Sequence, residues 1–184
     1  KGRILIDGKD IHNYSLADLR RNVGIVQQDV FLFSGNIKDN IALNNDELSD
    51  EEIIQVAKYV NADKFISKLP NGYNEPVMER GATLSTGQRQ LIAFARVLAY
   101  NPSIFILDEA TSNIDTETEL LIQDALNKII KDRTSIIIAH RLSTIQNVDR
   151  ILVLHKGEIV EEGSHFELLD KQGLYYDLYR LQYT

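Results

Sequence analysis

The chain has 184 residues, of which 43% are hydrophobic and none is cysteine, and its formal net charge is −7. This length suits one domain with a large buried core, and the lack of cysteine excludes disulfides and thiolate metal sites. The acidic balance argues against a broad nucleic-acid surface. The longest apolar run covers residues 91–95, whereas a membrane helix needs about 20 such residues. We therefore expect a soluble chain with no nucleic-acid partner.

Short strand-like runs alternate with helical patterns from the start of the chain. Residues 3–6 and 23–26 predict strands, and Ser15 begins a short helix between them. No internal repeat and no low-complexity segment interrupts this alternation. The pattern indicates a folded α/β domain rather than a fibrous or disordered chain.

Two capping boxes, in which a Ser oxygen pairs with an acidic or amide residue three positions later, mark the next helices. Ser49 with Glu52 opens one helix, and Ser85 with Gln88 opens another. The second helix is apolar on nearly every face, so we expect it to be deeply buried. Together these patterns predict a helical insertion over approximately residues 43–100.

Residues 101–184 return to alternating strands and helices. Continuous apolar strands between helices predict an α/β fold with a mostly parallel sheet, flanked by helices on both faces. The predicted elements in this part are a strand at 104–107, a helix at 117–131, a strand at 134–139, a hairpin of strands at 151–154 and 159–160, and helices that begin near Ser164 and Leu174.

Two carboxylates follow the apolar strand at residues 104–107. Asp108 and Glu109 emerge where this strand ends, and ligands of open α/β sheets bind at that edge. One carboxylate can hold Mg²⁺ while the next orients and deprotonates a water. The alternative for this segment alone is that both carboxylates merely solvate the loop after the strand.

The start of the helix after Leu84 is a candidate anion site. Ser85, Thr86, Gly87 and Gln88 form a small polar turn, and a helix N-terminus has free backbone N–H groups that bind phosphate. The glycine would let a phosphate approach the backbone closely. Taken alone, an ordinary capped helix is the better interpretation of this segment.

Two further polar residues follow predicted strands. Gln28 comes after the strand at 23–26, and His140 comes after the strand at 134–139. If these strands are parallel to the one before Asp108, all three residues lie at one sheet edge. Either residue alone would more often be structural.

The order and spacing of these segments resemble the ABC ATPase family, with its RecA-like core. The matching positions are Gln28 for the Q-loop glutamine, residues 84–88 for the signature motif, residues 104–108 for Walker B, Glu109 for the catalytic glutamate, residues 112–115 for the D-loop and His140 for the switch histidine. Exporter-type domains are the most similar, because residues 29–33 and 36–37 resemble the exporter segment after the Q-loop and Glu79-Arg80-Gly81 resembles the exporter X-loop. That loop departs from the exporter pattern at Glu75 and Met78.

This resemblance implies an ATPase that uses ATP and Mg²⁺ in a head-to-tail dimer with a second ABC ATPase domain. A transmembrane domain, absent from this chain, would hold it at the cytoplasmic face of the cell membrane and select an unknown cargo for export. The implied roles are Mg²⁺ binding for Asp108, general base for Glu109, contact with Mg²⁺ or the attacking water for Gln28, contact with the γ-phosphate for His140, and nucleotide binding for Ser85, Thr86, Gly87, Gln88 and Asp115. Because Thr86 replaces the family's usual glycine, we expect weaker binding of the opposite domain's ATP.

The phosphate-binding consensus Gly-x-x-x-x-Gly-Lys-Ser/Thr does not occur in these residues. The only Gly-Lys pair is Gly8-Lys9, which is followed by Asp10. We therefore expect a partial ABC ATPase domain that begins after Walker A, is catalytically silent alone, and is marginally stable or needs partners. Two alternatives stay open, a non-transport ABC ATPase and a fragment whose only activity is nucleotide-independent dimerisation.

Overall fold

The computed structural model describes residues 2–43, 45, 47–78, 81–108, 114–131, 133–139 and 144–183. The chain divides into two compact units, residues 1–138 and 139–184, and each is considered by itself. In chain order, the first unit contains β1 (Leu5–Ile6), β2 (Lys9–Asp10), the 3-10 helix η1 (Ile11–Asn13), α1 (Leu16–Asn22), β3 (Val23–Val26), β4 (Gly35–Asn36), α2 (Ile37–Ala42), α3 (Asp50–Tyr59), α4 (Asp63–Ile66), the 3-10 helix η2 (Gly72–Asn74), β5 (Pro76–Val77), α5 (Thr86–Ala99), β6 (Ile104–Asp108), α6 (Thr116–Ile130) and β7 (Thr134–Ile138).

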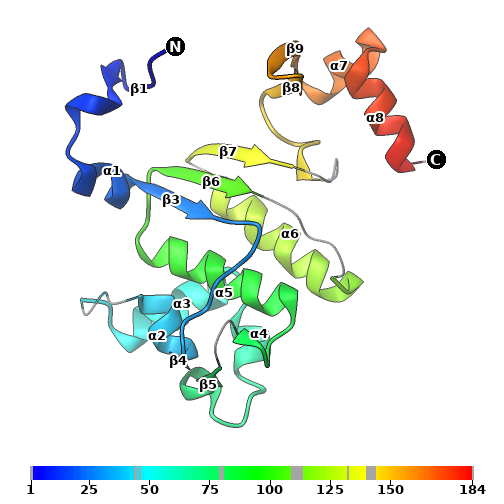
Figure 1. Cartoon of the computed structure of the whole chain (residues 1–184). Coiled ribbons are helices and arrows are strands. Elements are labelled where there is room, and N and C mark those ends of the chain that lie inside the picture. Colours follow the sequence, from blue (N-terminus) through cyan, green and yellow to red (C-terminus); the bar gives the residue numbers. More distant parts are fainter. Residues whose placement is uncertain are drawn as a thin grey trace. The chain divides into compact units, whose positions relative to one another are not determined.

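A three-stranded parallel sheet forms the centre of this unit, in the order β3-β6-β7 (Figure 1). Val26 pairs with Leu107, and Asp108 pairs with Ile138. The short strands elsewhere pair in antiparallel fashion, so the prediction of a mostly parallel sheet holds for the sheet that carries the candidate site. All three central strands therefore end at the same edge.

Helices α5 and α6 pack against one face of the sheet and complete the core. The side chains of Phe105 and Leu107 alternate into this core, where they are 0% and 1% exposed. Helix α5 buries nine of its fourteen residues, which confirms the expected deep burial. Phe94 on α5 meets Phe105 edge to face, with the two ring centres 6.4 Å apart, a separation typical of aromatic pairs.

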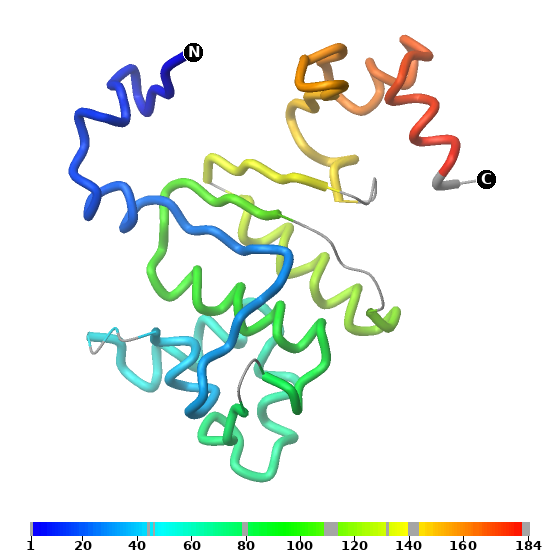
Figure 2. The backbone as a smooth tube through the Cα atoms, viewed as in Figure 1, coloured from blue at the N-terminus to red at the C-terminus, as the bar shows by residue number. Residues whose placement is uncertain are grey.

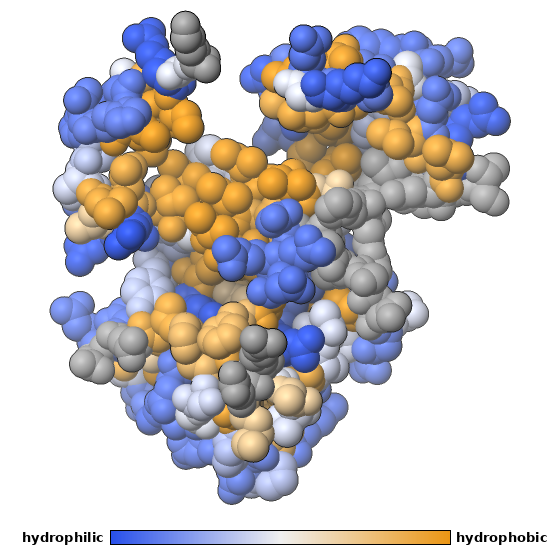
Figure 3. All heavy atoms as spheres, in the orientation of Figure 1, coloured by the Kyte–Doolittle hydropathy of each residue, from blue (hydrophilic) through white to orange (hydrophobic). Residues whose placement is uncertain are grey.

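The opposite face of the sheet is apolar and open. Ile25, Ile136 and Ile138 are each more than half exposed, and Figure 3 shows apolar residues gathered over the strands. Because strand side chains alternate between the two faces, these residues point away from α5 and α6. The expected helical cover of this second face is not seen among the described residues of the first unit.

Helices α2, α3 and α4 form a layer on the other side of α5. Their buried residues include Ile37, Ile41, Ile53 and Ile66, which pack in the same core as α5. The chain that leaves β3 runs past α5 before it enters β4, as the tube in Figure 2 shows. Strand β4 then pairs with β5, which follows about forty residues later in the chain.

The second unit contains the antiparallel hairpin β8 (Ile151–His155) and β9 (Glu158–Gly163), followed by α7 (His165–Lys171) and α8 (Leu174–Tyr183). The predicted turn at Lys156-Gly157 is confirmed, and both residues have the positive φ that a tight hairpin turn needs. In its core the buried His165 Nδ1 lies 2.7 Å from the hydroxyl of the buried Tyr175. Among the described residues of the chain, no helix is long and apolar enough to cross a bilayer.

Candidate active site

The carboxyl ends of β3 and β6 bring two predicted site residues to one edge of the sheet. Val26 ends β3 opposite Leu107, and Asp108 ends β6 one residue later. Gln28 follows β3 by two residues, so it continues past the same edge. Ligands of open α/β sheets bind at this carboxyl edge, where neighbouring strands deliver side chains from separate parts of the sequence.

Several predicted site residues lie outside the described residues. These include Glu109, which follows Asp108, and His140, which follows the last residue of β7 by two positions. Ser112 and Asn113 of the D-loop-like segment and Glu79 and Arg80 of the X-loop-like segment are also outside them. Their roles stay predictions.

Asp108 and Gln28 differ in their surroundings. Asp108 is half-buried, whereas Gln28 is exposed. The alternation along β6 places Asp108 on the same face as Ile106, opposite the core residue Leu107. A carboxylate and a side-chain amide both offer the hard oxygen ligands that Mg²⁺ accepts beside water and phosphate, so this pair fits a magnesium ion. No cluster of three or more metal-ligating side chains occurs among the described residues, which do not include Glu109 and His140.

The predicted capping box at the start of α5 is present. Ser85 Oγ accepts a hydrogen bond from the Gln88 N–H at 3.2 Å, and Gln88 Oε1 accepts one from the Ser85 N–H at 3.0 Å. The N–H groups of Thr86 and Gly87, in the first helical positions, have no acceptor within the helix. A phosphate-binding helix start has N–H groups of this kind, which lack a partner in their own helix.

Arg89 holds this first turn in place. Its guanidinium donates to the Leu84 carbonyl at 2.7 Å and to Thr86 Oγ1 at 3.2 Å. The Thr86 side chain is thus oriented by its own helix. Thr86 is exposed and occupies the first position of α5, where a β-branched residue is tolerated.

Gly87 is buried against the start of α6. A Cβ atom at this position would overlap the Thr118 methyl group and come within 3.3 Å of Ile114 Cγ2. Glycine therefore allows the first turns of α5 and α6 to touch directly. The signature-like turn and the end of the D-loop-like segment meet through this contact.

Asp115 uses its carboxylate to cap α6. Its Oδ1 accepts a hydrogen bond from the Thr118 N–H at 2.9 Å. Hydrogen bonds from the Thr118 backbone and side chain hold the pKa of this carboxyl below its usual value. The residue predicted to bind nucleotide therefore has a local structural role that is sufficient to explain an acidic residue here.

The candidate residues form two groups. No hydrogen bond or ion pair between described residues joins the Ser85–Gln88 turn to Gln28 or Asp108. One group is the carboxyl edge of the sheet, and the other is the paired starts of α5 and α6. This separation is compatible with the expectation that the two groups act on different nucleotides.

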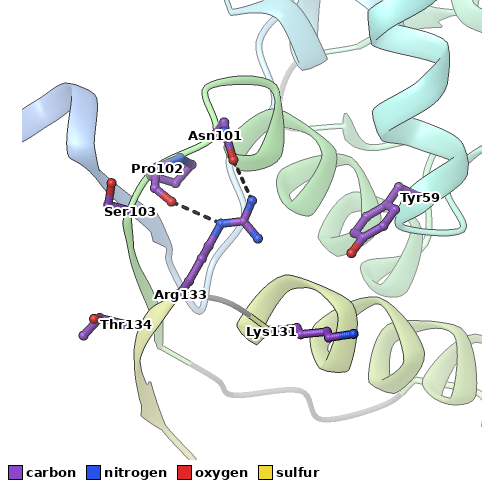
Figure 4. Close-up of a pocket in the computed structure, with 7 residues that line it drawn as sticks. All are labelled: Tyr59, Asn101, Pro102, Ser103, Lys131, Arg133 and Thr134. Carbon is purple, nitrogen blue, oxygen red and sulfur yellow. Dashed lines mark hydrogen bonds between the residues drawn. The ribbon is translucent and has the colours of Figure 1, made fainter.

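A pocket of about 490 Å³ lies at the other, amino end of the strands. Figure 4 shows Arg133 at its centre, with a guanidinium that donates to the Pro102 carbonyl at 3.1 Å and to Asn101 Oδ1 at 2.7 Å. Its third nitrogen donates to the Ile129 carbonyl at 2.9 Å. Because these donors already have protein acceptors and β6 separates the pocket from Asp108, the pocket does not coincide with the candidate site.

Sequence reasoning missed Asn40 and Arg96, which fix the segment after Gln28. Asn40 is 2% exposed on α2, and Arg96 is a half-buried cation among the apolar residues 91–99 of α5. Burial lowers the pKa of Arg96 from its usual value. An arginine within this apolar part of the helix was the available signal, because a buried charge needs partners.

Comparison with known protein families decides the family. A model described as "ABC transporter" matches residues 1–112, which is more than half of the chain. The chain belongs to the ABC transporter family. The ABC transporter domain fold is confirmed by a solved structure, described as a bacterial Atm1-family ABC exporter with ATP bound. It has a TM-score of 0.91 and 46% sequence identity, covering 100% of this chain and 32% of that one.

Two ABC transporter relatives show how the chain compares with longer proteins. A probable multidrug resistance ABC transporter ATP-binding/permease protein, YheH of Bacillus subtilis, is 56% identical over 182 residues, which are 99% of this chain and 27% of the relative. An ATP-dependent lipid A-core flippase of Syntrophus aciditrophicus is 53% identical over 182 residues, which are 99% of this chain and 30% of the relative. The chain therefore spans less than a third of the length of these two relatives.

Proposed function

We propose that these residues are part of the ATP-binding and ATP-hydrolysing domain of an ABC exporter, which couples ATP hydrolysis to export across a membrane. The observation that carries this proposal is the position of Asp108 at the carboxyl end of a buried parallel strand, beside the strand that leads to Gln28. The ATP-binding/permease and flippase names of the relatives support the exporter class. The cargo is chosen by the membrane part of such a protein.

In this proposal the carboxyl edge carries the reaction. Asp108 and the amide oxygen of Gln28 would hold Mg²⁺, which neutralises charge on the transferred phosphoryl group. Glu109 would accept a proton from the attacking water, and His140 would contact the γ-phosphate. Gln28 would also sense the attacking water.

The start of α5 has a different partner. Ser85 and Gly87 would bind the γ-phosphate of the ATP held by a second ABC ATPase domain, packed head to tail, and Thr86 and Gln88 belong to the same nucleotide-binding turn. The uncapped N–H groups of Thr86 and Gly87 support this role, since they face no acceptor of their own helix. Asp115 would lie at the same dimer interface while it caps α6.

The domain organisation belongs to the same proposal. Residues 43–100 would form the helical insertion that carries the signature turn, and residues 101–184 would carry Walker B, the D-loop, the switch histidine and the C-terminal hairpin and helices. A transmembrane domain would hold the ATPase at the cytoplasmic face of the membrane.

The experiment is a measurement of Mg-ATP binding and turnover by the complete transporter polypeptide, with Glu109→Gln as the variant. We expect turnover to fall by about a thousandfold or more while ATP binding persists, because a general base contributes to the chemical step. Glu158→Gln, at an exposed position of β9, is the matched control and should keep full turnover. Undiminished turnover of Glu109→Gln would refute the assignment.

A further inference from the structure

Arg96 reaches from α5 to the chain that follows Gln28. Its Nη1 donates to the carbonyl of Phe31 at 2.9 Å, and its Nε donates to the carbonyl of Asn40 at 2.8 Å. Its Nη2 donates to the side-chain Oδ1 of Asn40 at 3.0 Å. The guanidinium carbon also lies 5.8 Å from the centre of the Phe33 ring. One side chain of α5 therefore holds both α2 and the segment 31–33.

The buried side chain of Asn40 completes this connection. Its Oδ1 accepts from the Phe33 N–H and its Nδ2 donates to the Phe33 carbonyl, both at 2.8 Å. The Nδ2 group also donates to the Asn36 carbonyl at 3.0 Å. A single amide thus satisfies both backbone groups of Phe33, which lies outside any helix or strand. We call Asn40 and Arg96, with the three backbone groups that they bind in residues 31–33, the α5 anchor.

Gln28 lies between two fixed points. On one side is Val26, paired in the sheet with Leu107, and on the other is Phe31, held by Arg96. None of the hydrogen bonds or ion pairs between described residues involves the side chains of residues 27–29. The position of Gln28 is therefore set by the sheet and by the α5 anchor rather than by contacts of its own.

The geometry points to Asn40 and Arg96 as positioning residues that fix Gln28 relative to the helix that begins at Ser85. This inference rests on the proposed function, since it assigns Gln28 a place at the Mg²⁺ ion or the attacking water. Arginine is required because three separate acceptors match its planar fork, whereas a lysine ammonium has a single nitrogen. The anchor transmits any tilt of α5 directly to the chain next to Gln28.

The test uses Arg96→Lys in the complete transporter polypeptide, with two readouts. The first is amide hydrogen exchange in residues 29–35, which we expect to be about tenfold faster, as for the loss of a charge-assisted hydrogen bond. The second is the kinetics of ATP hydrolysis, in which kcat should fall by about three- to tenfold while KM for ATP changes by less than about twofold. This division follows because Gln28 would act in the chemical step.

Arg133→Lys is the matched control. Arg133 also makes three hydrogen bonds from a partly buried guanidinium, but at the amino end of the strands. Arg133→Lys should lose about as much thermal stability as Arg96→Lys. It should do so without faster amide exchange in residues 29–35 and without a change in kcat. Equal effects of the two substitutions on both readouts would mean that Arg96 serves stability alone, and would overturn the inference.

Asn40→Ala carries the same test if Arg96→Lys does not fold. It removes both side-chain bonds to Phe33 and leaves the Arg96 bonds to two backbone carbonyls. Unchanged exchange and unchanged kcat in a folded variant would overturn the inference. If Glu109→Gln retained turnover, the proposed function would fail by itself, and the exchange readout would still decide whether the anchor holds residues 29–35.

Discussion

Gly87, in the first turn of α5, packs directly against the methyl group of Thr118, in the first turn of α6. The space between these helix starts is too small for a β-carbon. This contact joins the signature-like turn to the segment that follows the Walker B strand. It also gives a simple test of how closely the two helices must approach.

Gly87→Ala should destabilise the protein by about 1–3 kcal/mol, because the added methyl overpacks the α5–α6 contact. Urea denaturation measures this change. Gly2→Ala is the control, because a β-carbon added at Gly2 would have no neighbouring atom within 4 Å. This substitution should leave the free energy of unfolding unchanged. A second substitution, Thr118→Ala, removes the opposing methyl, so in combination with Gly87→Ala it should recover part of the lost free energy of unfolding. If the effects of the two substitutions on that free energy were strictly additive, the proposed overlap would be contradicted.

Asp115→Ala should destabilise the protein by about 1 kcal/mol through loss of the N-cap of α6. Asp115→Asn should be nearly neutral, since asparagine caps as well as aspartate. Thermal denaturation of the two variants distinguishes the stability that comes from the N-cap hydrogen bond from any that comes from the negative charge. A large loss of stability in Asp115→Asn would show that the negative charge has another structural partner.

Thr86→Gly should lower KM for ATP in the complete transporter by about two- to threefold, because the branched side chain crowds the phosphate site at the helix start. The same change should cost up to about 1 kcal/mol of stability, since glycine is a poor helix residue and the hydrogen bond from Arg89 is lost. Thr86→Ala keeps the β-carbon, so its KM for ATP should lie between the values of the parent protein and of Thr86→Gly. Reduced ATPase activity of correctly folded Thr86→Gly would contradict the expectation of weaker binding with threonine.

Asp124 on α6 should make stability depend on pH below neutrality. A hydrogen bond from Asn61 Nδ2, 2.8 Å away, and a further bond from Lys128 hold its pKa below the ordinary value of 3.8. A lowered folded-state pKa gives stability that is present above the unfolded pKa and is lost as the pH falls through the folded pKa. Solvent screens this half-exposed group, so the contribution is below about 1 kcal/mol.

Urea denaturation at several pH values checks this prediction with Asp124→Asn. The variant should be less stable than the parent at pH 7, and the difference should vanish in acid below the folded pKa. Asp29→Asn, at an exposed position, is the surface control and should change the free energy of unfolding at pH 7 by less than about 0.5 kcal/mol. A constant difference across the whole range would exclude the Asp124 carboxyl as the titrating group.

Local structure could be predicted well from the residues. The capping boxes predicted at Ser49 and Ser85 are present, and the helix predicted near Ser164 begins with another, because each depends on a hydrogen bond between residues only three positions apart. The strand before Asp108 and the buried helix after Ser85 were also predictable, since both are long apolar patterns. Each signal lies within one short window of the chain.

Other features depend on residues far apart in the sequence. Helix α2 and the pairing of β4 with β5 were not predicted, because the two strands have two residues each and lie about forty residues apart. Helices were expected on both faces of the sheet, whereas Ile25, Ile136 and Ile138 are open in the described first unit. Apolar strands alone do not reveal what covers each face.

The sequence by itself determined the family-like order of motifs and the position of Asp108 at a strand end, because strand ends and caps follow from neighbouring residues. Only the tertiary structure decided that Arg96 and Asn40 hold the chain beside Gln28 and that Gly87 meets Thr118. The Arg96–Phe31 and Gly87–Thr118 contacts join segments that are close in space but separated by at least thirty residues along the chain. No local pattern encodes such distances, since packing of the whole core brings the partners together.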